Sequence, residues 1–315
     1  MKKCCLVLKV LVAIAGLLAS VQLVVAQEST PATGPAVNLV VTVEARHGSS
    51  VPDVTRDDVT AYEGRDRDRV TGWLPLQGDH AGLEFFIMLD DSSNVTLGSQ
   101  LEDIRQFINA QPPTTKIGVA YMSNGIAQVL QNLTTDHALA AKGLRLPLGN
   151  PGASASPYFS LEDLLKRWPA SDERREVLMI TDGIDRYWGS GPDNAYVDKV
   201  IEQAQRAGVI VYSIYSPGVG HYGHSYWRTY WGQNYLSQLS DETGAESYYL
   251  IGSAAPVSFV PYFEDISRKI NHQYLLSFIA KPQKKAGMQR VKVQTEVPNA
   301  ELVSADRVYV PATPH

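Results

Sequence analysis

Residues 85–94 read Phe-Phe-Ile-Met-Leu-Asp-Asp-Ser-Ser-Asn, an apolar run that ends in acidic and other polar side chains. A continuous apolar run of this length is typical of a strand buried on both faces of a parallel sheet. Residues 177–183, Val-Leu-Met-Ile-Thr-Asp-Gly, repeat the pattern. Ligands of open α/β sheets bind at the carboxyl ends of the strands, so both strands would deliver an aspartate to one crevice. Asp90 and Asp182 therefore predict a site for a hard divalent cation.

The first 26 residues have the features of a secretory signal peptide. Lysines stand at positions 2 and 3, a mostly apolar stretch covers residues 6–25, and small residues precede a cleavage point after Ala26. We therefore predict export, with the mature protein secreted or held in the periplasm or cell envelope. An uncleaved membrane anchor is the alternative. Both cysteines, Cys4 and Cys5, lie in this leader, so the mature chain must rely on a hydrophobic core rather than on disulfides.

The charge of the chain excludes one class of partner. The full chain has 28 Lys and Arg against 33 Asp and Glu, a formal net charge of −5, and loss of the lysine-bearing leader would make it more acidic. An acidic chain without a basic stripe is unsuited to binding the phosphates of nucleic acids. No segment after residue 26 is apolar enough to cross a bilayer, so we expect no membrane span after signal cleavage.

The pattern of side chains changes along the mature chain. Residues 27–36 are polar and contain prolines, which is typical of a linker. Residues 37–82 and 273–315 alternate apolar and polar side chains, as strands with one wet face do. Residues 83–272 instead alternate strands with helices. We therefore predict an α/β fold, with a doubly wound, mostly parallel sheet and a small accessory β module from both chain ends.

Apolar spacing and turn residues predict the elements of the central segment. Further strands are expected at 116–122, 127–130, 209–215 and 246–251. Helices are expected at 97–108, 136–146, 161–168, 197–207, 235–243 and 257–270. Gly208 and Gly244 would end two of these helices as C-cap glycines.

The motifs at residues 85–94, 177–183 and 211–215 resemble those of a von Willebrand factor type A domain. More narrowly, the mature chain resembles the exported bacterial VWFA-related proteins known mainly from acidobacterial genomes. The resemblance to the type A domain covers residues 83–272. It implies a doubly wound sheet with one antiparallel edge strand. It also implies a metal-ion-dependent adhesion site, which in this family usually holds Mg²⁺ and binds proteins through an open coordination position.

The resemblance also implies which residues would hold the Mg²⁺ ion. Carried over residue by residue, the ligand set is Asp90, Ser92, Asn94, Ser156 and Asp182. Asn94 stands where the family has its second serine, and an amide oxygen is still a neutral oxygen ligand. The family's threonine has no counterpart, and Ser156 is preferred to Ser154 because it lies nearer the next expected helix. These two departures leave a metal-free site as the alternative, in which such an aspartate caps the following helix.

Two further acids lie beside this site, Asp91 and Asp185. Either carboxylate could reach a metal through a water molecule, or could lie in solvent without a role. We expect Asp91 to be solvated.

An aromatic segment follows the strand expected at 209–215. Residues 216–233 are expected to form a long loop over the edge that carries the two aspartates, and such loops are often functional. The candidate partner-binding residues are Tyr222, Tyr226, Trp227, Arg228, Tyr230 and Trp231. These residue types dominate the hot spots of protein interfaces. Residues 186–188, Arg-Tyr-Trp, would extend the patch. The alternative is a lid whose rings pack on the protein itself.

Together these features predict an exported, non-enzymatic protein-binding or adhesion module that recognises a protein or cell-surface ligand. One alternative is a metal-dependent hydrolase that uses the same carboxylates. The sequence offers it little support, because it contains no Gly-rich phosphate loop, no Gly-x-Ser-x-Gly motif and no Asp-x-Asp pair at Asp90. The other alternative is a structural envelope protein with a metal-free site.

Overall fold

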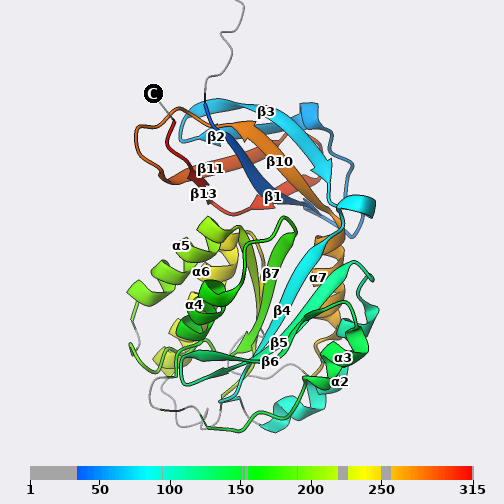
Figure 1. Cartoon of the computed structure of the whole chain (residues 1–315), viewed down its shortest axis with the longest axis vertical. Helices are drawn as coiled ribbons and strands as arrows, with labels where there is room; N and C mark the ends of the chain where they lie inside the picture. Colours follow the sequence, from blue (N-terminus) through cyan, green and yellow to red (C-terminus); the bar gives the residue numbers. More distant parts are fainter. Residues whose placement is uncertain are drawn as a thin grey trace, which may run out of the picture. The chain divides into compact units, whose positions relative to one another are not determined.

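Two β-sheets organise the chain (Figure 1). The computed structural model describes residues 34–93, 95–150, 152, 155–189, 191–218, 226–249 and 257–313. The leader expected at residues 1–26 lies outside the described residues. Within them, no helix is both long enough and apolar enough to cross a membrane.

The first sheet has six strands in the order β6-β5-β4-β7-β8-β9. Its strands are β4 (Leu83–Asp90), β5 (Thr115–Ser123), β6 (Ile126–Thr134), β7 (Arg174–Thr181), β8 (Val209–Tyr215) and β9 (Ser247–Tyr248). Neighbouring strands pair in parallel, except that β6 pairs with β5 in antiparallel. The sheet is therefore mostly parallel with one antiparallel edge strand, which confirms the predicted α/β fold class.

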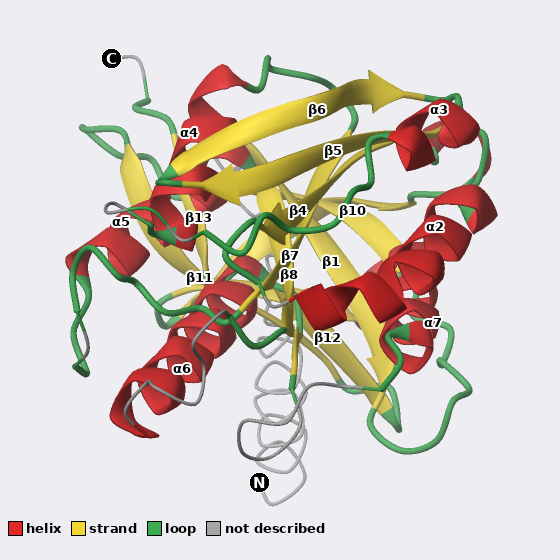
Figure 2. Cartoon of the chain, turned by 90° about the horizontal axis from the view of Figure 1, so that it is seen from below, coloured by secondary structure: helices red, strands yellow, loops and turns green. Residues whose placement is uncertain are grey.

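Helices cover both faces of this sheet, as Figures 1 and 2 show. One face carries α4 (Pro157–Arg167), α5 (Ala195–Ala207) and α6 (Tyr226–Thr243). The other face carries α2 (Leu101–Ala110), α3 (His137–Lys142) and α7 (Val260–Asn271). The sheet is doubly wound, and its carboxyl-terminal edge lies between the two layers of helices.

The two cores explain the unbroken apolar run of β4. Alternate residues of a strand point to opposite faces of the sheet. Phe85 and Leu89 accordingly belong to the core under α2 and α7, whereas Phe86 and Met88 belong to the core under α4, α5 and α6. All eight residues of β4 are buried. The strand is therefore held rigidly, and so is Asp90 at its end.

The second sheet has seven strands in the order β12-β1-β10-β3-β2-β11-β13. Its strands are β1 (Ala36–Ala45), β2 (Val59–Glu63), β3 (Asp66–Pro75), β10 (Gln273–Ile279), β11 (Gly287–Thr295), β12 (Ala300–Ser304) and β13 (Arg307–Val310). Its neighbouring strands pair in antiparallel. Fully buried side chains such as Val41, Phe278 and Val310 form its core.

Some element boundaries differ from the sequence prediction. The edge strand expected at 127–130 is longer, because β6 continues to Thr134 beside β5. The helix expected at 136–146 ends at Lys142, since Gly143 occupies its C-cap. The helix expected at 97–108 begins as a 3₁₀ helix, η3 (Val95–Gln100). Two other 3₁₀ turns are η1 (Arg56–Asp58) and η2 (Gly78–His80).

Asp68 gives the second sheet a pH dependence that can be measured. Its side chain is buried on β3, and burial, with a smaller contribution from Glu63, raises the pKa of Asp68 to about 7. A raised carboxyl pKa favours the folded state at low pH, and this contribution is lost as the pH rises through the folded-state value. We therefore expect Asp68→Asn to raise the free energy of unfolding by about 1 kcal/mol at about pH 8 and by less at about pH 5. Denaturant titrations at both pH values test this, and equal effects at both would contradict it.

Candidate functional site

The two predicted aspartates meet at the carboxyl-terminal edge of the six-stranded sheet. β4 and β7 are parallel neighbours, with Leu89 opposite Ile180, so both strands end at the same level. Thr181 Oγ1 at the end of β7 donates a hydrogen bond to Asp90 Oδ2 at 2.6 Å. Asp182 follows directly and is completely buried.

Both oxygen atoms of the Asp90 carboxylate accept hydrogen bonds. Ser92 N and Ser92 Oγ donate to Asp90 Oδ1 at 2.8 and 2.6 Å, while Thr181 occupies Oδ2. Burial raises the pKa of Asp90, and the charge of Asp182 adds to this effect, whereas the bonds from Ser92 and Thr181 oppose it. Of the three partners, the backbone N–H of Ser92 can only donate, so Asp90 Oδ1 acts as an acceptor.

Asp182 forms a buried ion pair that the sequence analysis did not include in the site. Arg186 Nη2 lies 2.7 Å from Asp182 Oδ2, and the backbone N–H of Ile184 donates to Oδ1 at 2.9 Å. The side chain of Arg186 is only 12% exposed and that of Asp182 is 0% exposed. Although burial acts to lower the pKa of Arg186, Asp182 raises it overall, so the guanidinium stays charged.

The segment after β8 closes over this ion pair. Gly218 forms an isolated antiparallel bridge with Ser93, the neighbour of Ser92. A Cβ atom at Gly218 would lie closer than 3.0 Å to Asp182 Oδ2 and to Arg186 Nη2. The backbone at Gly218 therefore lies directly against the ion pair.

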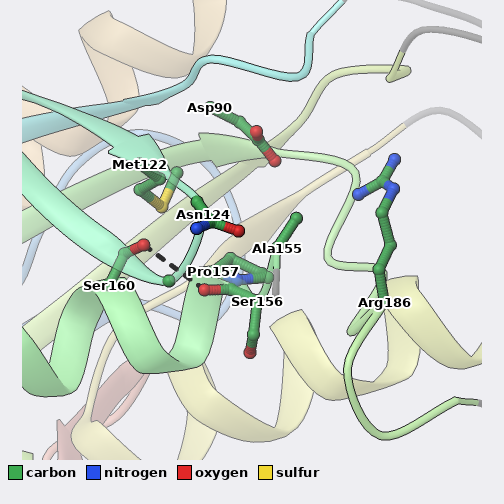
Figure 3. Close-up of a pocket in the computed structure, with 9 residues that line it drawn as sticks. Asp90, Met122, Asn124, Ala155, Ser156, Pro157, Ser160 and Arg186 are labelled. Carbon is green, nitrogen blue, oxygen red and sulfur yellow. Dashed lines mark hydrogen bonds between the residues drawn. The ribbon is translucent and has the colours of Figure 1, made fainter. Parts of the chain in front are cut away.

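Ser156 lines the same small pocket as Asp90 and Arg186, as Figure 3 shows. The pocket has an empty volume of about 190 Å³, part of it open to solvent. Ser156 is the N-cap of α4, and its Oγ accepts a hydrogen bond from Phe159 N at 3.4 Å. Of the predicted ligand set, Asp90, Ser92, Ser156 and Asp182 thus lie at this edge, whereas Asn94 lies outside the described residues.

The donor set in this arrangement does not fit a Mg²⁺ ion. Mg²⁺ requires octahedral oxygen ligands with free lone pairs directed at the ion. Each carboxylate oxygen of Asp90 and Asp182 instead accepts a hydrogen bond, and a guanidinium already lies against Asp182. Among the described residues, no group of three or more His, Cys, Asp or Glu could hold a metal ion.

The expectation that Asp91 is solvated is wrong. Asp91 is 1% exposed and forms a bidentate ion pair with Arg145, with Nη1–Oδ1 and Nη2–Oδ2 distances of 2.7 and 2.9 Å. The backbone N–H of Leu148 also donates to Asp91 Oδ1. The Asp91 carboxylate binds Arg145 and Leu148, and the backbone oxygen of Asp91 accepts a hydrogen bond from Gly149 N, so this residue fixes the segment 145–149 rather than facing solvent.

Asp185 is also buried, and it positions aromatic residues. Asp185 Oδ1 accepts hydrogen bonds from the backbone N–H groups of Tyr187 and Trp188, both at 3.0 Å. Asn194 Nδ2 donates to Asp185 Oδ2 at 3.1 Å. The rings of Tyr187 and Trp188 are about half exposed, at 54% and 51%. The carboxylate thus holds the turn that presents these two rings.

The aromatic segment predicted as a loop is helical from Tyr226 onward. α6 begins nine residues before the helix expected at 235–243, so the loop prediction is wrong for residues 226–233. We call Tyr226, Trp227 and Tyr230 the α6 aromatic group; their exposed fractions are 73%, 62% and 41%. The three rings contact one another, with centroids 5.6–6.2 Å apart.

The other candidate partner-binding residues are placed differently. Arg228 is exposed on α6. Trp231 is only partly exposed, packs against the core under α6 and stacks on Tyr235 at a centroid distance of 6.4 Å. Tyr222 lies outside the described residues. Trp231 therefore packs on the protein itself, as the alternative interpretation of this segment expects, whereas the α6 aromatic group faces solvent.

Comparison with known proteins gives structural neighbours only. No protein family model and no curated protein matches the sequence. A von Willebrand factor type A protein from Catenulispora acidiphila is 10% identical, with 89% of this chain and 71% of that chain covered and a TM-score of 0.45. An aerotolerance-related membrane protein from Bacteroides fragilis is 14% identical (60% and 99% covered, TM-score 0.44). The von Willebrand factor domain of a type V pilus tip protein from Porphyromonas gingivalis is 11% identical (60% and 95% covered, TM-score 0.43).

The mostly parallel sheet, its antiparallel edge strand and the helices on both faces are those that the resemblance implied. The predicted fold class, a doubly wound and mostly parallel sheet with one antiparallel edge strand, is confirmed by the sheet topology. At the carboxyl-terminal edge of this sheet, Arg186 lies on Asp182, one of the two aspartates.

Proposed function

We propose that this protein is a non-enzymatic binding module that recognises a protein or other cell-surface ligand at the carboxyl-terminal edge of its six-stranded sheet. The exposed α6 aromatic group is the observation that carries the proposal. Tyr and Trp side chains contribute most of the binding energy at protein interfaces when they become buried. Three such rings exposed together on one helix are costly to solvate and suited to burial by a partner.

The bonding of the two aspartates supports the non-enzymatic part of the proposal. A catalytic carboxylate must offer a free lone pair to a proton or to a metal-bound water. The carboxylate oxygens of Asp90 and Asp182 accept hydrogen bonds from the protein, and Asp182 is also paired with Arg186. Their arrangement supports a role in holding the strand ends and the following loops in place, and it gives no support to the hydrolase alternative.

We further propose that the protein acts outside the cytoplasm, in the periplasm, at the cell envelope or after secretion. The positively charged start and apolar stretch of residues 1–26 support this localisation. Adhesion to a protein of the envelope or of another cell surface is the function that suits such a place and such a binding edge. A fusion of residues 1–26 to a reporter enzyme that is active only after export would test the localisation, and cytoplasmic retention would contradict it.

Truncation of the α6 aromatic group should weaken partner binding. We expect Trp227→Ala and Tyr230→Ala each to lower the affinity about tenfold or more, because each removes a large ring from the interface. Both side chains are exposed, so the melting temperature should hardly change. The measurement is quantitative binding of one purified envelope partner, first isolated on the immobilised wild-type protein.

Leu130→Ala provides the matched control for this experiment. Leu130 is an apolar residue of β6 with 46% exposure, comparable to that of Tyr230. It lies on the edge strand that is farthest from β8 and β9 in the sheet. Binding that is unchanged in both aromatic variants, or that falls equally in Leu130→Ala, would exclude the proposed surface.

A further inference from the structure

We propose that Arg186 is a permanent replacement for the divalent cation of this site, so that the binding edge is organised without metal. The proposal concerns the same edge as the proposed function but can be tested without any partner. Its basis is the environment of Asp182, the hydrogen bonds of both carboxylates and the backbone that covers them.

The charge of Asp182 requires a cation within the protein. A completely buried carboxylate is stable only when a charged partner and hydrogen bonds compensate its lost hydration. Arg186 supplies the charge at 2.7 Å, and Ile184 N supplies a further hydrogen bond. The guanidinium is nearly as buried as its partner, at 12% exposure, so the pair is shielded from solvent. A metal ion is not needed to neutralise this carboxylate.

A divalent ion at Asp182 would have to compete with the guanidinium of Arg186. Asp90 uses its oxygens for Ser92 and Thr181, and Asp182 uses its own for Ile184 and Arg186. Mg²⁺ gives up its water shell reluctantly and demands near-ideal octahedral geometry. Entry of the ion at Asp182 would therefore break the Asp182–Arg186 ion pair.

The backbone at Gly218 lies directly beside the ion pair. It approaches the Asp182–Arg186 pair so closely that a Cβ atom there would collide with both side chains. The bridge between Gly218 and Ser93 ties the same segment to the loop after β4.

Arg186 also connects the site to the exposed rings of Tyr187 and Trp188. Its backbone N–H donates to Ala155 O at 2.9 Å, which joins this turn to the segment before α4. The next two residues are fixed by Asp185. The arginine thus anchors, at its side chain and at its backbone, the turn that presents Tyr187 and Trp188. A partner at this edge would meet a surface that does not depend on metal concentration.

Direct metal titration of the purified wild-type protein is the first test. We expect no rise in Tm at a few millimolar Mg²⁺ and no binding of Mn²⁺ detected by paramagnetic relaxation. A wild-type protein that binds either ion in a way that Asp182→Asn abolishes would overturn the proposal. This measurement involves no partner, so its failure is separate from a failure of the proposed binding function.

Removal of the arginine should create a metal response. In Arg186→Gln, we expect Mg²⁺ at about 100 times its dissociation constant to raise Tm by about 5 °C. The matched control is Arg145→Gln, which removes the cation from a single carboxylate, Asp91, and should lower Tm without a response to Mg²⁺. A folded Arg186→Gln protein that ignores Mg²⁺ would overturn the claim that Arg186 excludes the metal. Should this variant fail to fold, the wild-type titration still decides the question.

Discussion

Gly183→Ala is expected to lower the free energy of unfolding by about 3 kcal/mol or more. Gly183 has a φ of +68°, a conformation that costs a residue with a side chain about 1–2 kcal/mol. A Cβ atom at this position would also lie closer than 3.0 Å to Gly232 O and to Leu236 Cγ of α6. Because the nearest atom belongs to the backbone of a helix, the collision can be relieved only by moving α6. That crowding adds about 1–3 kcal/mol.

Gly208→Ala separates the cost of the backbone conformation from the cost of crowding against α6. Gly208 is the C-cap of α5 and has a φ of +64°, nearly that of Gly183, but no atom within 4 Å of its Cβ position. We expect this variant to lose only the conformational share, about 1–2 kcal/mol. Denaturant titrations of both variants give the comparison. Equal losses would show that α6 does not pack on Gly183 as tightly as the structure indicates.

The fold could be predicted from the sequence in those strands where burial alone determines the order of apolar and polar residues. The apolar runs of β4, β7 and β8 are continuous because each strand contacts helices on both faces. Parallel neighbours then bring the strand ends together, which is why Asp90 and Asp182 could be placed at one edge. Gly208 was predicted as a C-cap and has the positive φ that favours glycine there.

The ion pairs could not be predicted, because they depend on distances that the sequence pattern does not contain. Arg145 and Asp91 are 54 residues apart, and only the folded chain brings them together. Asp182 and Arg186 are four residues apart but lie in a turn, so the spacing rule for charges on helices does not apply. Periodicity likewise missed the first turns of α6, because large aromatic side chains lie on the exposed face of this part of the helix, so apolar residues do not recur on one face alone.

Arg186→Met is expected to destabilise the protein by about 3–5 kcal/mol, because it leaves the carboxylate of Asp182 buried without a counter-charge. Methionine retains most of the apolar stem of arginine, so the loss reports mainly on charge. The double variant Asp182→Asn with Arg186→Met removes both charges, while the asparagine oxygen can still accept the bond from Ile184. We expect the double variant to recover most of the loss. A double-mutant cycle from denaturant titrations at neutral pH measures the coupling.

The Glu102–Arg105 pair on α2 provides the control cycle. Its two side chains are 60% and 41% exposed, so solvent screens their attraction. Exposed pairs of this kind contribute less than about 1 kcal/mol. Within the described residues, Arg186 alone forms an ion pair with Asp182. If Arg186 replaces a structural cation, the coupling free energy between Arg186 and Asp182 must therefore be several times that of the exposed pair. A coupling free energy no larger than that of Glu102 and Arg105 would mean that the Asp182–Arg186 pair is not needed to hold the two strand ends. Another ligand would then have to organise the site.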